Sequence, residues 1–300
     1  MNPAPSLDPK DLALVRLLQQ DGRASYEALA ARIGLSRAAT RARVLRLAGD
    51  GVVRIVGIVH PALLGRTVSA HVAVAVEGEA APTARALADL PEAVFVTLAA
   101  GRRPVIAELR TVSFGALSTL LAGLARLPGV RAVDTTPYTR VVKDPYLPTE
   151  PPQPLELDDT DHAILRALQS DGRMSYAVLA EQIGMSPAAT RARSLRLLEA
   201  GVFRVVALTR PGAVGLGHLA GFALRRDGTG PDVAELVAAD SVQFAAECVG
   251  RADVIGTVGG ATLGQVLTAL EKLRASAGVH ALESWLHLEL VQERYDSATR

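Results

Sequence analysis

The sequence predicts an α+β protein in which one plan occurs twice, a small helical domain followed by a domain of alternating strands and helices. The first observation is a repeat: residues 7–56 recur as residues 157–206, and about thirty of the fifty paired positions are identical. The second is a change of period, because apolar residues follow helical spacing inside each repeat and strand-like alternation after it. Three hundred residues are enough for two to four compact units.

Three short helices are expected at the start of each repeat. In the first copy, Asp8 caps a helix that has apolar residues at helical spacing up to Gln20. Ser25 caps a second helix, which Gly34 ends in a position that favours a left-handed residue. Ser36 begins a third helix. Two helices joined by a short turn that contains glycine predict a helix-turn-helix.

The third helix is expected to end near Gly49 and to turn Thr40, Val44 and Leu47 inward. The apolar run Val52–Val59 follows directly and predicts a strand or wing. We therefore expect a winged helix-turn-helix in each repeat.

The segment 67–142 predicts the order β-α-β-β-α-β of a ferredoxin-like unit. Its strands are expected at 69–76, 94–98, 105–109 and 130–142, and its helices at 82–90 and 114–127. The same order recurs from about residue 219 to residue 292. Five prolines in 144–154 predict an extended spacer between the two halves.

These signals divide the chain into five consecutive segments. We expect an N-terminal winged helix-turn-helix domain at 1–60, a first ferredoxin-like domain at 61–143, a proline-rich linker at 144–156, a second winged helix-turn-helix domain at 157–210 and a second ferredoxin-like domain at 211–300.

Composition excludes several classes of protein. No apolar run is long enough to span a membrane, and the N-terminus lacks the order of an export signal, so a cytoplasmic protein without membrane contact is expected. The six histidines have no i, i+4 pair and the single cysteine, Cys248, excludes a multi-cysteine site, which predicts no metal and no cofactor. Cys248 is interpreted as a small buried residue and Trp285 as a core or interface residue. Gly256–Gly260 is interpreted as a strand-to-helix turn, because no lysine follows it.

Charge is concentrated in the helical repeats, although the net charge is only +1. Residues 7–59 contain nine basic and five acidic residues, and four of these arginines lie within ten positions that contain no acid. The side chains could simply solvate a surface helix. Three of the four recur in the second repeat, however, so contact with phosphates is the favoured interpretation.

The motifs of the repeat resemble those of the leucine-responsive/asparagine-regulator (Lrp/AsnC) family of transcription factors. They are L-D-x-x-D, D-G-R-x-S, G-L-S or G-M-S before the third helix, R-x-x-R-L within it, and the following G-V. Members of that family usually carry one helix-turn-helix and one ferredoxin-like effector domain, so the chain looks like two members fused. The resemblance implies a regulator of double-stranded DNA that responds to an amino acid or a similar small molecule and forms homo-oligomers. The two effector domains could pair within one chain or exchange between chains.

Recognition helices read bases from their N-terminal residues, so the expected DNA contacts lie on the third helix of each copy. In the first copy they are Ser36, Arg37, Ala38, Arg41 and Ala42, with Arg43 and Arg46 reaching phosphates or bracing the second helix. In the second copy they are Ser186, Arg191, Arg193 and Arg196. Binding by the second copy is expected to be weaker, because Pro187 replaces Arg37 and more acidic residues surround it.

The resemblance also implies an effector pocket between paired effector domains, near a G-x-x-D turn. The second copy keeps that turn as Gly250 to Asp253, whereas the first has Gly101 followed by Pro104 in the place of the acid. A carboxylate can accept a hydrogen bond from an amino group and proline cannot, so the second pocket is expected to be the better sensor.

Two other functions share this plan. Siroheme decarboxylases resemble it, but they carry a histidine on the strand before the turn, where this chain has Phe95–Thr97 and Phe244–Ala246. Acid-base chemistry needs a positioned titratable group, so the enzyme is the alternative rather than the main prediction. A ligand-sensing module without DNA binding is the third reading, and the arginine-rich helices argue against it.

Overall fold

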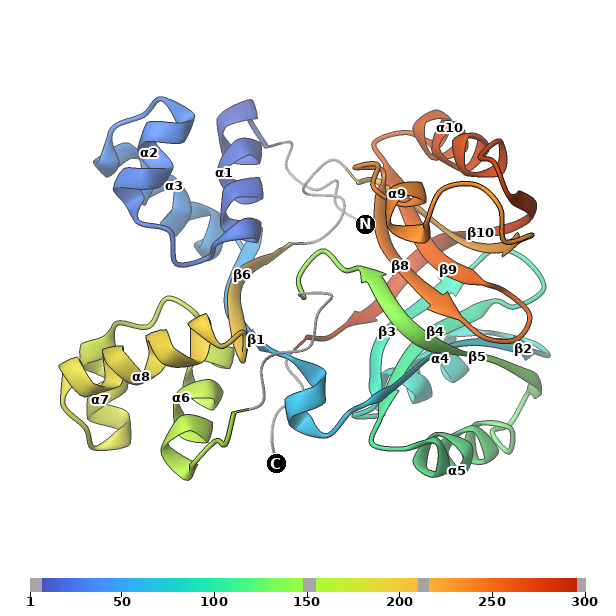
Figure 1. Cartoon of the computed structure of the whole chain (residues 1–300), viewed down its shortest axis with the longest axis horizontal. Helices are drawn as coiled ribbons and strands as arrows, with labels where there is room; N and C mark the ends of the chain where they lie inside the picture. The colour runs from blue at the N-terminus through green and yellow to red at the C-terminus, as the bar shows by residue number, and fades with distance from the viewer. Residues whose placement is uncertain (1–6, 148–154, 210–215, 296–300) are drawn as a thin grey trace. The chain divides into compact units, whose positions relative to one another are not determined.

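The computed structural model describes residues 7–147, 155–209 and 216–295. They form two compact units, and each unit takes residues from both repeats: residues up to 64 and from 146 to 209 form unit 1, and residues 65–145 and 216–295 form unit 2 (Figure 1). Residues 148–154 of the expected linker lie outside the described residues.

Unit 1 contains three helices from each repeat. These are α1 (Pro9–Gln20), α2 (Tyr26–Ile33) and α3 (Arg37–Gly49), followed in the second repeat by α6 (Asp159–Ser170), α7 (Tyr176–Ile183) and α8 (Pro187–Glu199). The side chains of Asp8, Ser25 and Ser36 cap the first three helices, as predicted. Gly34 ends α2 with φ +66°, the left-handed conformation that glycine adopts without strain. Thr40, Val44 and Leu47 are buried, as predicted.

The strand that follows each helix-turn-helix pairs across the repeats. Strand β1 (Val53–Val59) lies antiparallel to β6 (Phe203–Thr209), and Val56 is opposite Val206, which lies 150 residues further along the chain. The predicted wing is therefore one half of a two-stranded sheet that both copies share. The register is reciprocal between the copies. Val53 is opposite Thr209, the counterpart of Val59, and Val59 is opposite Phe203, the counterpart of Val53, as in a contact across a two-fold axis.

Unit 2 is a closed eight-stranded barrel built from two ferredoxin-like halves. The first half comprises β2 (Val68–Val76), α4 (Ala81–Ala88), β3 (Ala93–Ala99), β4 (Val105–Thr111), α5 (Phe114–Leu124) and β5 (Val130–Lys143). The second half comprises β7 (His218–Arg226), α9 (Val233–Leu236), β8 (Val242–Cys248), β9 (Val254–Gly260), α10 (Leu263–Arg274) and β10 (Val279–Glu293).

The long last strand of each half joins it to the other half. Strand β5 pairs with β8, strand β10 pairs with β3, and each of these junctions contains register shifts. Effector-domain pairing, which the sequence left open, therefore takes place within one chain. Helices α4 and α5 cover the outer face of the first half, and α9 and α10 cover that of the second (Figure 1).

One expectation for unit 2 was wrong. Gly256–Gly260 lies inside β9 rather than in a turn, because Gly256 leaves space for the ring of Phe222 against the sheet. The first helix of the second half, α9, is only four residues long.

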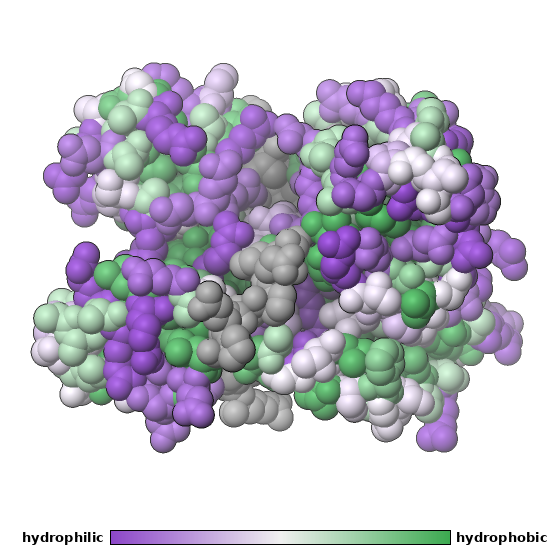
Figure 2. Space-filling view, viewed as in Figure 1, coloured by the Kyte–Doolittle hydropathy of each residue, from purple (hydrophilic) through white to green (hydrophobic). Residues whose placement is uncertain are grey.

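The surface of unit 2 exposes large apolar residues at several places, among them α10, β10 and the start of α5. Hydrophobic residues gather over α5 in Figure 2, and Val112 and Phe114 are each more than half exposed there. No helix in the described part of the chain has the length and apolar character needed to cross a lipid bilayer.

Candidate DNA-binding helices and a barrel cavity

The N-terminal half of α3 presents unpaired basic groups. Arg37 and Arg41 are exposed, and neither forms an ion pair within the described residues. Ala38 and Ala42 are exposed beside them, as a surface that meets DNA requires. Ser36 is exposed as well, but its hydroxyl accepts the backbone N–H of Ala39 at 3.2 Å and so caps the helix.

The C-terminal half of α3 is attached to α1. Arg43 donates to Asp8 and to one carboxylate oxygen of Asp11, and Arg46 donates to the other oxygen of Asp11 at 2.5 Å. Arg43 also keeps the pKa of Asp8 below its ordinary value, by a hydrogen bond to the carboxylate. The two arginines were expected to reach phosphates or to brace the second helix, whereas the structure pairs them with the first.

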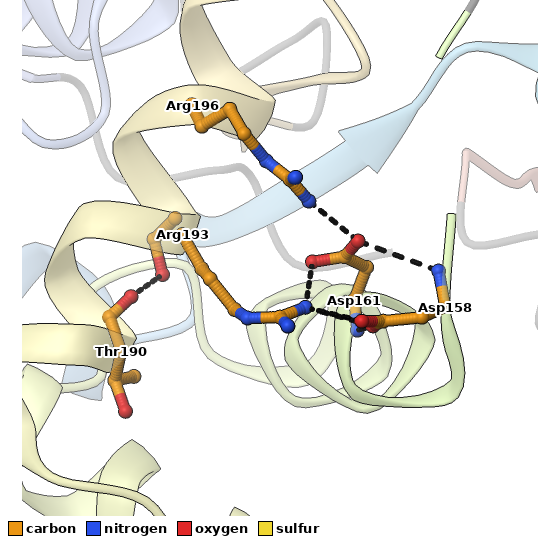
Figure 3. A network of polar contacts seen from close by, with 6 residues as sticks. Asp158, Asp161, Thr190, Arg193 and Arg196 are labelled. Carbon is orange, nitrogen blue, oxygen red and sulfur yellow. Dashed lines mark hydrogen bonds and ion pairs between the residues drawn. The ribbon is translucent and has the colours of Figure 1, made fainter. Parts of the chain in front are cut away.

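The second repeat reproduces this arrangement on α8 (Figure 3). Arg193 bridges Asp158 at 2.7 Å and Asp161 at 2.9 Å, and Arg196 binds the other oxygen of Asp161 at 2.6 Å. Arg191, the counterpart of Arg41, is exposed and has no ion pair within the described residues. The hydroxyl of Ser186 caps α8 by accepting the N–H of Ala189. Each recognition helix therefore has a free N-terminal half and an anchored C-terminal half.

The D-G-R motif of each repeat fastens one helix-turn-helix to the other. The guanidinium of Arg23 donates to the carbonyl oxygens of Gly172 and Met174, at 2.9 Å each, and lies over the ring of Tyr176. Arg173 makes the reciprocal contacts, with the carbonyl oxygens of Gly22 and Ala24 at 2.9 Å each and with the ring of Tyr26. We call these two sets of contacts the reciprocal clamp.

The glycines of the same motif let the chains approach. A Cβ on Gly22 would lie 2.9 Å from the backbone of Val205, and one on Gly172 would lie 2.8 Å from that of Val56. The N–H of Gly22 donates to Val205 and that of Gly172 donates to Ile55. The repeated motif is therefore a device for pairing the two domains, and its recurrence was the only sequence signal of that role.

Unit 2 contains a cavity between its two halves. Its volume is about 440 Å³. Small apolar residues and Trp285 line its inner part, and its outer part carries three arginines and two acids: Arg102, Arg103, Arg251, Asp134 and Glu283. A smaller pocket shares His71 and Trp285 with this cavity and is also lined by His287.

Only one of the three expected effector residues lines this cavity. Gly101 lines it, whereas Gly250 and Asp253 are not among its lining residues. The carboxylate of Asp253 accepts the backbone N–H of Arg226 at 2.7 Å and lies 3.7 Å from Arg225. The turn of the first copy, which was expected to be the altered one, therefore supplies the lining. Whether either turn contacts a ligand stays a prediction.

Sequence reasoning missed the histidines of the barrel. His71 lies on β2 with its ring centroid 5.3 Å from that of Trp285, and His287 lies on β10 with its ring edge-on to Phe95 at 5.5 Å. Burial lowers the pKa of His71 to about 3 and that of His287 to about 4. Strand alternation places His71 on the face of β2 opposite to Val72, which packs in the core beneath the helices. That alternation could have indicated that His71 faces the barrel interior.

Cys248 is half-buried beside Tyr138, and burial raises the pKa of its thiol to about 12. The thiol is therefore protonated at neutral pH and is no nucleophile.

Comparison with known proteins gives two kinds of match. A model of the AsnC-type helix-turn-helix domain matches residues 7–48 and 157–198. An uncharacterized HTH-type transcriptional regulator of Pyrococcus abyssi is 32% identical over 143 residues, which are 47% of this chain and 90% of that protein. The HTH-type transcriptional regulator LrpA of Mycobacterium tuberculosis is 35% identical over 133 residues, 43% of this chain and 89% of LrpA.

A solved structure matches almost the whole chain. The crystal structure of the siroheme decarboxylase NirDL aligns with a TM-score of 0.65 over 95% of this chain and 92% of that chain, at 15% identity. This match shows that the two-copy fold is shared.

Proposed function

Because the chain belongs to the Lrp/AsnC family of helix-turn-helix transcriptional regulators, we propose that it binds operator DNA through α3 and α8 as an internal dimer. The reciprocal clamp and the β1–β6 pair carry this proposal, since they fix the two recognition helices in one unit. A pair of two-fold related readers fits a pseudo-palindromic operator. Such a regulator acts where the genomic DNA is, and we place it in the cytoplasm.

We assign different roles to the basic residues of each recognition helix. Arg37, Arg41 and Arg191 contact DNA, because their guanidinium groups have no ion pair within the described residues. Arg43 and Arg46, with their counterparts Arg193 and Arg196 in the second copy, position the helix through the aspartates of α1 and α6. Alanines at 38 and 42 can contact thymine methyl groups only, so the shape of the DNA supplies part of the specificity.

Mutation of the free arginines tests the DNA interface. Genomic fragments selected by the purified protein are titrated with it at several salt concentrations. The double variant Arg37→Ala/Arg41→Ala should weaken binding and reduce the salt slope by about 0.9 for each lost phosphate contact. Thermal stability should change by less than about 0.5 kcal/mol, since both side chains are exposed. Arg126→Ala in unit 2 is the matched control. Unchanged binding by the double variant would refute the assignment.

We further propose that an amino-acid-like effector acts through unit 2 and that the chain forms homo-oligomers. The cavity between the two halves supports the first part, and the exposed Val112 and Phe114 support the second. Light scattering of the purified chain, with and without candidate amino acids, tests both parts. A monomer under all of these conditions would contradict the second.

One observation favours a second function, that of a siroheme decarboxylase-like enzyme. Strands β3 and β8 carry no histidine at 95–97 and 244–246, but the fold brings His71 and His287 from other strands into the barrel. Neutral imidazoles are suited to proton transfer and to iron ligation. Addition of siroheme to the purified protein, followed by absorbance, tests this function. A shifted spectrum that is lost in His71→Ala/His287→Ala would support it, and an unchanged spectrum would exclude it.

A further inference from the structure

The cavity of unit 2 presents buried nitrogen atoms that have no hydrogen-bond partner within the described residues. The indole Nε1 of Trp285 and the Nε2 of His71 are buried and form no hydrogen bond within the described residues. Trp285 Nε1 can only donate, so it needs an acceptor. A buried polar group without a partner is destabilising, and a bound acceptor atom would remove that cost.

The position of Trp285 is built into the sheet. Trp285 on β10 is opposite Gly221 on β7, and a Cβ at Gly221 would overlap the indole ring. The missing side chain lets the ring lie against the barrel wall beside His71. The lining also includes Ala73 and Ala223, whose short side chains leave room for a compact apolar group.

Charge at the mouth of the cavity favours an anion. Asp134 is bound by Arg103 and by Arg251, and Arg251 also binds Glu283. Both carboxylates are therefore engaged. Arg102 is exposed at the rim and has no ion pair within the described residues. The three arginines and two acids leave one positive charge to be balanced.

We propose that this cavity binds an organic carboxylate with a compact aromatic or apolar body. Its carboxylate oxygens accept hydrogen bonds from Trp285 and His71, and the positive charge of Arg102 at the rim attracts the anion to the cavity. Because arginines outnumber carboxylates at the rim and both carboxylates already pair with an arginine, we expect a simple acid to bind better than a zwitterionic amino acid. This assignment deepens the effector part of the proposed function and does not depend on DNA binding.

Trp285 is the only tryptophan of the chain, so its fluorescence reports directly on the cavity. The full chain is titrated with phenylacetate, L-phenylalanine, phenylacetamide and phenethylamine, without DNA. These probes share one aromatic body and differ in charge. We expect a saturable change in emission with phenylacetate, weaker binding of L-phenylalanine and of the neutral amide, and no saturable change with the amine.

Two variants locate the binding. Arg102→Gln should weaken phenylacetate binding by about tenfold, as loss of one ionic contact of about 1.4 kcal/mol would do. His71→Phe keeps a ring beside Trp285 and removes the nitrogen, so it should weaken binding too. Arg126→Gln is the control for lost charge and should bind normally. Calorimetry with Trp285→Phe checks the loss of the indole donor.

Several results would overturn the inference. The first is the lack of a saturable response to phenylacetate. The second is tighter binding of phenethylamine or of L-phenylalanine than of phenylacetate. The third is undiminished phenylacetate binding by both the Arg102 and the His71 variants. DNA affinity of the unliganded protein, measured in parallel, tests the proposed function separately. A failure to bind carboxylates can therefore be distinguished from a failure to bind DNA.

Discussion

Asp11 and Asp161 are buried carboxylates, 3% and 1% exposed, and each is held by two arginines of a recognition helix. An ion pair of this kind contributes little net stability against an apolar replacement, but removal of one partner leaves uncompensated charge. The sequence motif L-D-x-x-D is therefore explained by the arginines that follow 35 residues after Asp8 and Asp11.

The first prediction compares two carboxylates that contact the same arginine. Asp11→Asn should lower the free energy of unfolding by about 1.5–3 kcal/mol, because Arg43 and Arg46 lose the charged acceptor of their hydrogen bonds. Asp50→Asn removes an exposed partner of Arg46, 3.7 Å away, and should cost less than about 1 kcal/mol. Urea denaturation followed by circular dichroism measures both. Equal losses would show that the network does not anchor α3.

At the level of elements, the reciprocal clamp and the β1–β6 pair connect the two copies, and neither uses residues of the recognition surface. Each clamp arginine donates from both terminal nitrogens to two carbonyls while it stacks on a tyrosine ring. Lysine cannot reproduce that planar geometry. The clamp therefore sets the relation between the two readers rather than the affinity of either.

The second prediction separates those two properties. Arg23→Lys/Arg173→Lys should bind a single half-site as the parent does, because α3 and α8 are intact. It should bind a two-half-site operator at least about tenfold more weakly, since a rigid pair gains affinity from effective concentration. Fluorescence anisotropy with both probes measures this difference. An equal loss on the half-site would mean that the clamp arginines contact DNA themselves.

The elements differ in how far the sequence could predict them. Helix starts were predictable because Asp8, Ser25 and Ser36 make local caps. Strand partners were not, because β5–β8 and β10–β3 pairing joins segments more than one hundred residues apart through bulges. The different roles of the arginines on α3 were not predictable either, because they depend on contacts with a helix distant in the sequence. Only the contact between α1 and α3 distinguishes Arg43 from the exposed Arg41.

The cavity shows the same limit at the scale of the whole molecule. The siroheme decarboxylase alternative predicts a histidine on the strand before each turn, and this chain has none at 95–97 or 244–246. The closed barrel instead brings His71 and His287 together with Trp285 from β2 and β10. Such a constellation depends on barrel closure, and local sequence pattern does not encode that closure.

The stability of unit 2 should depend on pH through two opposing groups. Burial lowers the pKa of His71 and His287 to about 3 and about 4, below the ordinary 6.5. The unfolded chain therefore binds more protons as pH falls through 6.5, and stability decreases there. Burial raises the pKa of Glu293 from 4.5 to about 7. The contribution of Glu293 to folding stability is therefore full below pH 4.5 and is lost as pH rises through 7.

The two windows overlap between pH 4.5 and 6.5, so separate variants of the glutamate and of the histidines are needed to distinguish their effects. Urea unfolding is followed by Trp285 fluorescence. We expect the urea midpoint of Glu293→Gln to fall more steeply on acidification than that of the parent protein. His71→Gln/His287→Gln should show the reverse, a midpoint that rises as pH falls from 7 to 4.5. His280→Gln, an exposed histidine of β10, should follow the parent. If all four proteins gave parallel curves, the buried groups would be titrating as they do in the unfolded chain, and the barrel interior would be open to water.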